Sequence, residues 1–148
     1  MEVAPISLTD APIAGAIEFI GILCIHLLSA KQLARMDVLG SSDPYCILQI
    51  GQQTMKSKVI KNNLNPNWNE TLMFSWDGIS PLIINVMDKD RFKQDDHIGM
   101  LNFDISSLYA AGMLQDKEEL KMDLRLENTP ANGKDGTIQF GLTLNLLI

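Results

Sequence analysis

Short apolar runs separated by turn-forming residues fill most of this chain. Runs typical of β-strands cover residues 21–28, 45–50, 54–61, 70–76, 82–87, 98–103, 120–126 and 137–146. The last two runs alternate between apolar and polar residues, as half-exposed strands do. Turn signals such as Asp43-Pro44, Asn65-Pro66 and Asp77-Gly78 lie between the runs. This pattern predicts an all-β fold, specifically an antiparallel β-sandwich.

One segment, residues 104–112, breaks the strand pattern. Asp104 or Ser106 suits the start of a helix, because a short oxygen-bearing side chain accepts hydrogen bonds from the free N–H groups there. Ala110 and Ala111 favour the helical conformation, and Gly112 suits its C-terminal end. The sequence therefore adds one short helix to the sandwich.

The length of 148 residues suits a single domain. We expect residues 21–148 to form this domain and residues 1–20 to be an N-terminal extension or a leading strand. The apolar stretch Ile13–Ala30 approaches the shortest membrane-spanning helix. Its Glu18 and His26 would be costly inside a bilayer, so a core strand preceded by a connecting segment is the preferred interpretation. The N-terminus is not basic, and no secretory signal is predicted.

Composition and charge narrow the function. The net charge of −6 argues against a general nucleic-acid binder, and against binding to anionic lipid unless cations offset the field. Cys24 and Cys46 lie in apolar runs and are expected to be buried free thiols, which fits a reduced cytoplasmic location. His26 and His97 have no nucleophile partner in the sequence pattern, so no enzymatic site is predicted.

Five aspartates in two clusters carry the clearest chemistry. The first cluster is Asp37 and Asp43, and the second is Asp88, Asp90 and Asp96. Each cluster follows a strand-like run, so the two segments can meet at one end of a sandwich. Carboxylates that converge either take up protons or bind a cation, and oxygen ligands on flexible loops favour calcium. The second cluster is not an EF-hand, because Phe92 and Lys93 stand where that loop needs an oxygen ligand and a glycine.

Three blocks of the sequence resemble the C2 domain family. In chain order they are Asp37-x5-Asp43-Pro44-Tyr45, Leu64-Asn65-Pro66-Asn67-Trp68-Asn69-Glu70 and Asp88-x-Asp90-x5-Asp96-x-Ile98-Gly99. They occur in the order and at the separations typical of the family, and the resemblance runs from about Gly21 to Leu146. Within the family, the stretch from Gly51 to Pro66 is most similar to the extended synaptotagmins and tricalbins.

The resemblance implies an eight-stranded antiparallel sandwich, in one of two circularly permuted topologies between which the sequence leaves the choice open. It also implies that loops at one end bind calcium and then anionic phospholipid. The five aspartate positions of the family fall on the five aspartates above, and backbone carbonyls near Met36, Lys89 and Gln94 are expected to complete the coordination. Calcium is therefore the expected cofactor and an anionic membrane the expected partner. The expected location is the cytoplasm, with peripheral membrane attachment on calcium binding.

The tips of the two aspartate segments are the expected membrane contacts. They are Val38 and Leu39 in the first segment and Arg91, Phe92 and Lys93 in the second. Apolar side chains at such tips are stabilised by insertion into the headgroup region. Each cationic side chain near an anionic surface contributes about 1 kcal/mol.

Lys56, Lys58 and Lys61 form a modest basic strip. In family members such as protein kinase C, lysines at the places of Lys56 and Lys58 help to bind phosphoinositide. The chain departs from that pattern at Met87, where an aromatic residue is common, and at Ile47, where a lysine is common. Phosphoinositide binding and a merely solvated lysine face therefore both stay open.

Taken together, the sequence predicts calcium-dependent binding of anionic phospholipid membranes, as a targeting or tethering module without catalysis of its own. Two alternatives stay open. One is a C2 domain used for protein contacts, in which calcium only stabilises the loops. The other is the targeting domain of a larger signalling enzyme, such as a kinase, a lipase or a Ras-regulating protein. The subfamily resemblance implies one domain of a larger multidomain protein.

Overall fold

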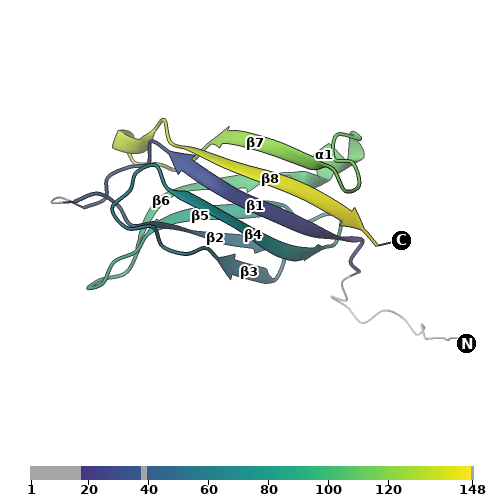
Figure 1. The fold of residues 1–148 in the computed structure, drawn as a ribbon, viewed down its shortest axis with the longest axis horizontal. Helices are drawn as coiled ribbons and strands as arrows, with labels where there is room; N and C mark the ends of the chain where they lie inside the picture. The colour runs from purple at the N-terminus through teal and green to yellow at the C-terminus, as the bar shows by residue number, and fades with distance from the viewer. Residues whose placement is uncertain (1–17, 38–39, 148) are drawn as a thin grey trace, which may run out of the picture.

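Two four-stranded antiparallel sheets pack face to face in the computed structural model, which describes residues 18–37 and 40–147 (Figure 1). The first sheet has the order β4-β1-β8-β7 and consists of Asn67–Trp76, Gly21–Lys31, Thr137–Leu146 and Glu119–Arg125. The second has the order β3-β2-β5-β6 and consists of Gln53–Lys56, Pro44–Ile50, Leu82–Asp88 and Asp96–Phe103. The predicted eight-stranded antiparallel sandwich is confirmed.

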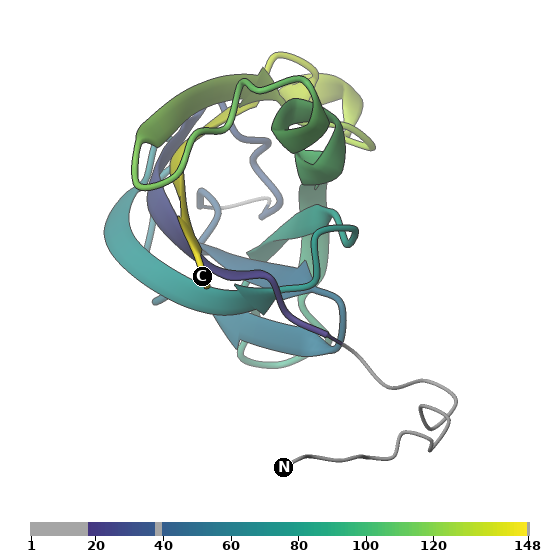
Figure 2. The ribbon, with the colours of Figure 1, turned by 90° about the vertical axis from the view of Figure 1, so that its right-hand side faces the viewer.

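Alternating burial along the strands β1 and β5 builds much of the core. In β1 the side chains of Leu23, Ile25 and Leu27 are fully buried, and the residues between them face outward or are half-buried. The strand β5 repeats the pattern from the opposite sheet. Figure 2 looks along the sandwich and shows the two sheets as curved walls on either side of this interior. Because the side-chain period of a strand is two, one face of each sheet supplies the core.

The predicted short helix is also confirmed. It spans Ile105–Ala110 (α1), and the Asp104 side chain caps it by accepting a hydrogen bond from the Ser107 backbone N–H. Gly112 follows the helix at φ +75°, a conformation that glycine adopts without strain. A second short helical turn, the 3-10 helix η2 (Ala131–Gly133), lies between β7 and β8.

Two predictions about the strands and their residues need correction. The third strand was predicted over residues 54–61, but β3 ends at Lys56. Beyond it the Ser57 hydroxyl, rather than a backbone carbonyl, accepts the Cys46 backbone N–H at 2.8 Å, which interrupts the ladder. Of the two cysteines, both free, only Cys46 is buried, because Cys24 lies on the outer face of its sheet.

The stretch considered as a membrane span ends in the strand β1. No helix among the described residues is long and apolar enough to cross a bilayer. The N-terminal extension or leading strand predicted over 1–20 falls mostly on residues 1–17, which lie outside the described residues, and residues 18–20 are not part of a strand.

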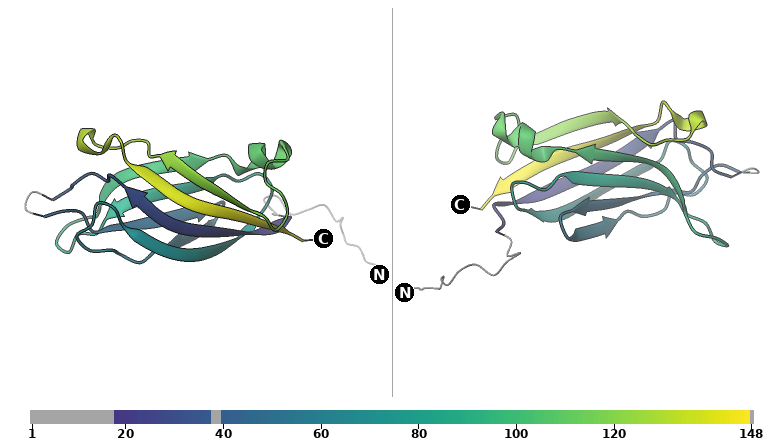
Figure 3. Two further views of the ribbon diagram at one scale, coloured as in Figure 1. Left: turned by 45° about the horizontal axis from the view of Figure 1, so that its top comes forward. Right: turned by 180° about the vertical axis from the view of Figure 1, so that it is seen from behind.

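The two ends of the sandwich differ in what they carry. Gly21 at the start of β1 pairs with Leu146 at the end of β8, so the described chain enters and leaves at one end. The connections β1–β2 and β5–β6 project from the opposite end, as both views of Figure 3 show. The first aspartate segment thus lies directly between β1 and β2. Its place after the first strand distinguishes between the two circularly permuted topologies that the sequence left open.

Candidate functional site

Strand register explains how aspartates distant in sequence come together. The strands β2, β5 and β6 are neighbours, and Asp88 pairs with Pro44 on one side and with Asp96 on the other. Asp43 immediately precedes Pro44 and therefore lies beside Asp88. We refer to Asp37, Asp43, Asp88, Asp90 and Asp96 as the aspartate cluster.

Backbone hydrogen bonds fix the two segments to each other. The Asp43 N–H donates to Asp88 Oδ1 at 2.8 Å, and the Lys89 N–H donates to the Asp43 carbonyl at 3.0 Å. The Asp43 carboxylate in turn accepts the Asn62 N–H at 2.8 Å. These contacts hold Asp43 and Asp88 side by side.

Asp88 lies at the bottom of the cluster and is only 1% exposed. Its Oδ2 atom is buried and has no hydrogen-bond partner among the described residues. Burial, foremost, and the nearby charges of Asp37, Asp43 and Asp96 raise the pKa of this carboxyl. A buried carboxylate oxygen without a partner is unfavourable and is rarely retained without a reason. Carboxylate oxygens are the type of ligand that a hard cation such as calcium prefers.

A lysine ammonium supplies positive charge at the outer side of the cluster. Lys93 Nζ lies 3.2 Å from Asp96 Oδ2 and 3.9 Å from Asp90 Oδ2, and Asp96 raises the pKa of Lys93. Asp90 Oδ1 accepts the backbone N–H groups of Phe92 and Lys93. In residues 18–37 and 40–147, no three carboxylate, imidazole or thiol groups are arranged to hold a metal ion as they are placed.

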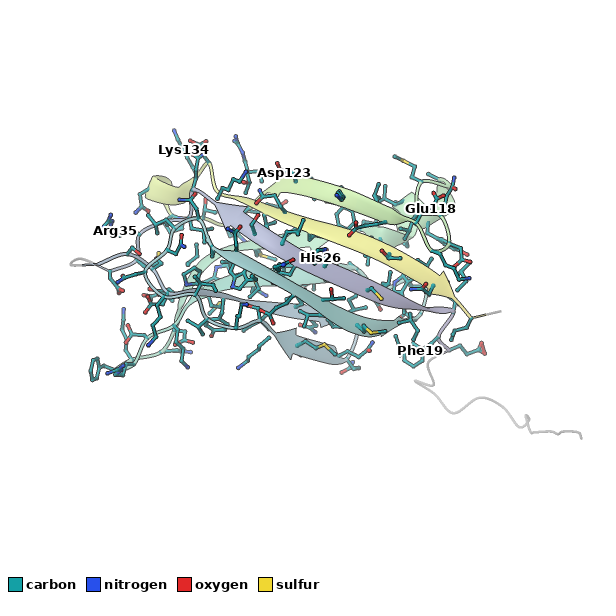
Figure 4. All side chains as sticks on the ribbon, in the orientation of Figure 1. Phe19, His26, Arg35, Glu118, Asp123 and Lys134 are labelled. Atoms are coloured by element: carbon teal, nitrogen blue, oxygen red, sulfur yellow. The ribbon has the colours of Figure 1, made fainter. Side chains whose placement is uncertain are left out.

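The first aspartate segment is anchored on both sides. The buried Ser42 hydroxyl donates to the Ala34 carbonyl at 2.7 Å and accepts the Met36 N–H at 3.0 Å. Arg35, which Figure 4 labels at the loop end, donates to the Gly40 carbonyl at 2.7 Å. Met36 and Asp37 are half-buried. The predicted membrane contacts Val38 and Leu39 lie outside the described residues.

The predicted contacts of the second segment project into solvent. Phe92 is 92% exposed, the most exposed large apolar side chain among the described residues, and its neighbours Arg91 and Lys93 are exposed as well. Gln94 is also exposed. The ribbon in Figure 1 shows this β5–β6 connection extending beyond the ends of the strands. An apolar ring held in water at a loop tip is available for an apolar environment.

An open hollow of about 420 Å³ lies beside the cluster. It is lined by Asp43, Val59, Lys61, Lys89, Asp90 and Arg91. Three of these six side chains are cationic, and Asp43 and Asp90 belong to the aspartate cluster. The hollow thus combines lysine and arginine donors, which a phosphate group could accept from, with two of the clustered carboxylates.

The three lysines of the predicted basic strip are exposed, but they do not all lie on one strand. Lys56 ends β3, whereas Lys58 and Lys61 follow it in an irregular segment. Lys56 and Lys58 are both exposed, and Ser57 between them is buried. Of the three lysines, Lys61 lines the hollow.

Asp95, which is not among the predicted calcium ligands, makes contacts of its own beside the aspartate cluster. Its side chain is 17% exposed, accepts the Tyr45 hydroxyl, and accepts the Asp90 N–H at 2.9 Å. No sequence signal marks this contact, because Tyr45 and Asp95 are 50 residues apart and belong to different loops and strands.

Comparisons with known proteins agree with the fold. A family model described as the C2 domain matches residues 21–124. Protein C2-DOMAIN ABA-RELATED 11 of Arabidopsis thaliana is 40% identical over 99 residues, 66% of this chain and 59% of that protein. Extended synaptotagmin-1 of Pongo abelii is 38% identical over 104 residues, 65% of this chain and 9% of that protein. The chain thus spans less than two thirds of the length of these relatives.

A solved structure of two consecutive C2 domains of extended synaptotagmin 2, calcium bound, gives a TM-score of 0.76 at 30% identity. The match covers 90% of this chain and 48% of that one.

Proposed function

The chain belongs to the C2 domain family, and we propose that it binds anionic phospholipid membranes in a calcium-dependent manner through its β1–β2 and β5–β6 loops. The family consists of binding and targeting modules, so no catalytic step is assigned to the chain. The same proposal includes a role as a tether or as the targeting domain of a larger protein. It also includes a cytoplasmic location with peripheral membrane attachment.

The observation that carries the proposal is the buried Oδ2 of Asp88, which lies near three further carboxylates and has no hydrogen-bond partner among the described residues. Asp37, Asp43, Asp88, Asp90 and Asp96 would hold calcium, with the backbone carbonyls near Met36, Lys89 and Gln94 as additional oxygen donors. Calcium would supply the positive charge that this cluster lacks. In its absence the carboxylates repel an anionic surface, and Lys93 offsets only the outer pair.

Membrane contact is supported by the surroundings of the cluster. Phe92 presents an exposed ring at the tip of its loop, which burial in the interface would stabilise. The hollow lined by Lys61, Lys89 and Arg91 offers donors for a lipid phosphate beside the proposed calcium ligands. Val38 and Leu39 remain proposed contacts on sequence grounds. Phosphoinositide binding by Lys56 and Lys58 also remains a prediction.

Vesicle sedimentation tests the proposal. The wild type should sediment with phosphatidylserine-containing vesicles in calcium, stay in solution in a chelator, and ignore vesicles of phosphatidylcholine alone. Asp88→Asn combined with Asp90→Asn should abolish sedimentation. The matched control is Glu118→Gln with Asp104→Asn, which changes the net charge equally. Glu118 lies at the end of the molecule opposite Arg35 (Figure 4), and asparagine keeps the capping role of Asp104.

Sedimentation in the chelator would refute calcium dependence. Calcium binding without sedimentation would favour the alternative of a protein-contact domain.

A further inference from the structure

One carboxylate next to the aspartate cluster connects the exposed tip of the β5–β6 loop to the sheet. The two oxygens of Asp95 are used by different elements: Oδ2 accepts the hydroxyl of Tyr45 in β2, and Oδ1 accepts the backbone N–H of Asp90 in the loop. Tyr45 is itself 7% exposed and held by the strand β2. Asp95 therefore links the backbone of a predicted calcium ligand to a rigid strand.

Asp95 differs from the five members of the cluster in its surroundings. Both of its oxygens have protein donors, and Lys89 Nζ lies 3.9 Å from Oδ2. Asp95 is thus a satisfied carboxylate, while Asp88 holds an oxygen without a partner among the described residues. A group whose oxygens are already engaged is poorly suited to bind an ion directly.

We propose that Asp95 and Tyr45 act as positioning residues, which hold the Asp90 backbone in the calcium-binding conformation without touching the ion. This inference rests on the proposed calcium-dependent function. Residues 89–95 form no strand or helix, so the Asp95 contacts restrict a segment that the sheet ladder does not. Losing them lets the loop populate other conformations, and the apparent affinity falls with the fraction of molecules that remain competent to bind.

Four variants separate positioning from direct ligation. Tyr45→Phe removes one contact and keeps every charge. Asp95→Asn loses the charge but keeps an acceptor for Asp90 and a polar group for the Tyr45 hydroxyl, whereas Asp95→Ala loses both contacts. Asp77→Ala is the matched control, because Asp77 makes similar contacts to Ile79 and Ser80 in the β4–β5 turn.

Calorimetric calcium titration of the full chain is the first measurement. We expect the affinity of Asp95→Ala to be lower by about tenfold, a change worth about 1.4 kcal/mol. Tyr45→Phe should show a smaller loss, and Asp95→Asn should stay closer to the wild type than to Asp95→Ala. Asp77→Ala should bind as the wild type does, whatever its thermal stability. The positioning role is wrong if Asp95→Asn loses as much affinity as Asp95→Ala while Tyr45→Phe is unaffected, since that pattern indicates a direct ligand.

Amide hydrogen exchange of Asp90 in the chelated protein is the second measurement, and it needs no bound calcium. Exchange should be faster in Tyr45→Phe and Asp95→Ala than in the wild type and Asp77→Ala. Unchanged exchange in both variants would overturn the proposed restraint. A wild type that binds no calcium would instead defeat the proposed function, so the two failures are distinct.

Discussion

Replacing Asp88 with asparagine is expected to stabilise the calcium-free protein and to remove its response to calcium. The side chain is 1% exposed, carries an oxygen without a partner among the described residues and lies near the carboxylates of Asp37, Asp43 and Asp96. Asparagine keeps an acceptor for the Asp43 N–H. Its new NH2 group can donate to the surrounding carboxylates, so the replacement exchanges an unfavourable charge for a hydrogen-bond donor.

The size of each effect follows from the same atoms. An unsatisfied buried polar group costs about 1–3 kcal/mol. Accommodating the amide offsets part of what its removal gains, so the free energy of unfolding of the calcium-free Asp88→Asn variant should rise by about 1 kcal/mol. For a chain of this length the melting temperature rises by about 2–4 °C. Calcium at about 100 times its dissociation constant should stabilise the wild type by about 2.7 kcal/mol, and the variant by almost nothing.

Thermal unfolding in chelator and in a calcium series measures both effects in one experiment. A calcium-free variant that melts below the wild type would show that the Asp88 charge is stabilising and refute the reasoning. A variant that still gains stability from calcium would show that Asp88 is not required for the ion. A Glu118→Gln control should change neither value, because Glu118 is exposed at the opposite end.

The same comparison has a defined pH dependence. Because the pKa of Asp88 is raised in the folded state, the folded protein binds this proton more tightly than the unfolded chain does. Wild-type stability therefore falls as pH rises through the interval between the unfolded and the folded pKa. The advantage of Asp88→Asn should be complete above that interval and disappear as pH is lowered through it. Other carboxyls, such as Asp77 and Asp95, contribute equally to both proteins and cancel in the difference.

Three further substitutions test separate parts of the loop end. Lys93→Gln should raise calcium affinity in lipid-free solution by about two- to fivefold, because an ammonium that competes for Asp90 and Asp96 is removed. Calorimetry measures this affinity, and the control Lys117→Gln should leave it unchanged, because Lys117 pairs with Asp116 instead. Phe92→Ser should weaken vesicle binding at saturating calcium by at least about tenfold, because burying the ring contributes about 1.5–3 kcal/mol. The control is Ile79→Ser at another exposed apolar residue, and equal vesicle binding by the two variants would contradict the insertion of the β5–β6 loop. Gly133→Ala should lower the free energy of unfolding by about 1–3 kcal/mol, since the added carbon would lie 2.7 Å from the Ala34 Cβ. The control Gly40→Ala should melt at nearly the wild-type temperature in thermal unfolding, because its added carbon would lie 3.7 Å from Asn62.

The fold was predictable because the pattern that encodes it is local. The apolar runs of β1 and β5 and the alternation of apolar and polar residues in β7 and β8 are visible in the sequence itself, and Asp104 and Gly112 mark the ends of α1 within a few residues of each other. The exception is β3, where the hydroxyl of Ser57 replaces a backbone acceptor. Such a replacement depends on the neighbouring strand and is invisible in the residues of β3 alone.

The candidate site was predictable to the extent that residue type and strand register determine it. The register of β2, β5 and β6 brings Asp43, Asp88 and Asp96 together, as expected for two segments that meet at one end of a sandwich. Two features depend on contacts between loops and could not be predicted. These are the link from Tyr45 to Asp95 and the ion pairs of Lys93, which the sequence suggested only as a membrane contact.

The opposed positions of the loops and the chain ends have a mechanical consequence. Gly21 and Leu146 pair at one end of the sandwich, and the β1–β2 and β5–β6 connections lie at the other. When the loops are held at a surface and the flanking chain is pulled, the load runs along the strands, and many ladder hydrogen bonds resist it simultaneously. When the two chain ends are pulled apart from each other, β1 and β8 separate one hydrogen bond at a time. The domain should therefore withstand far more force as a link between a surface and a tethered partner than as a link in a stretched chain.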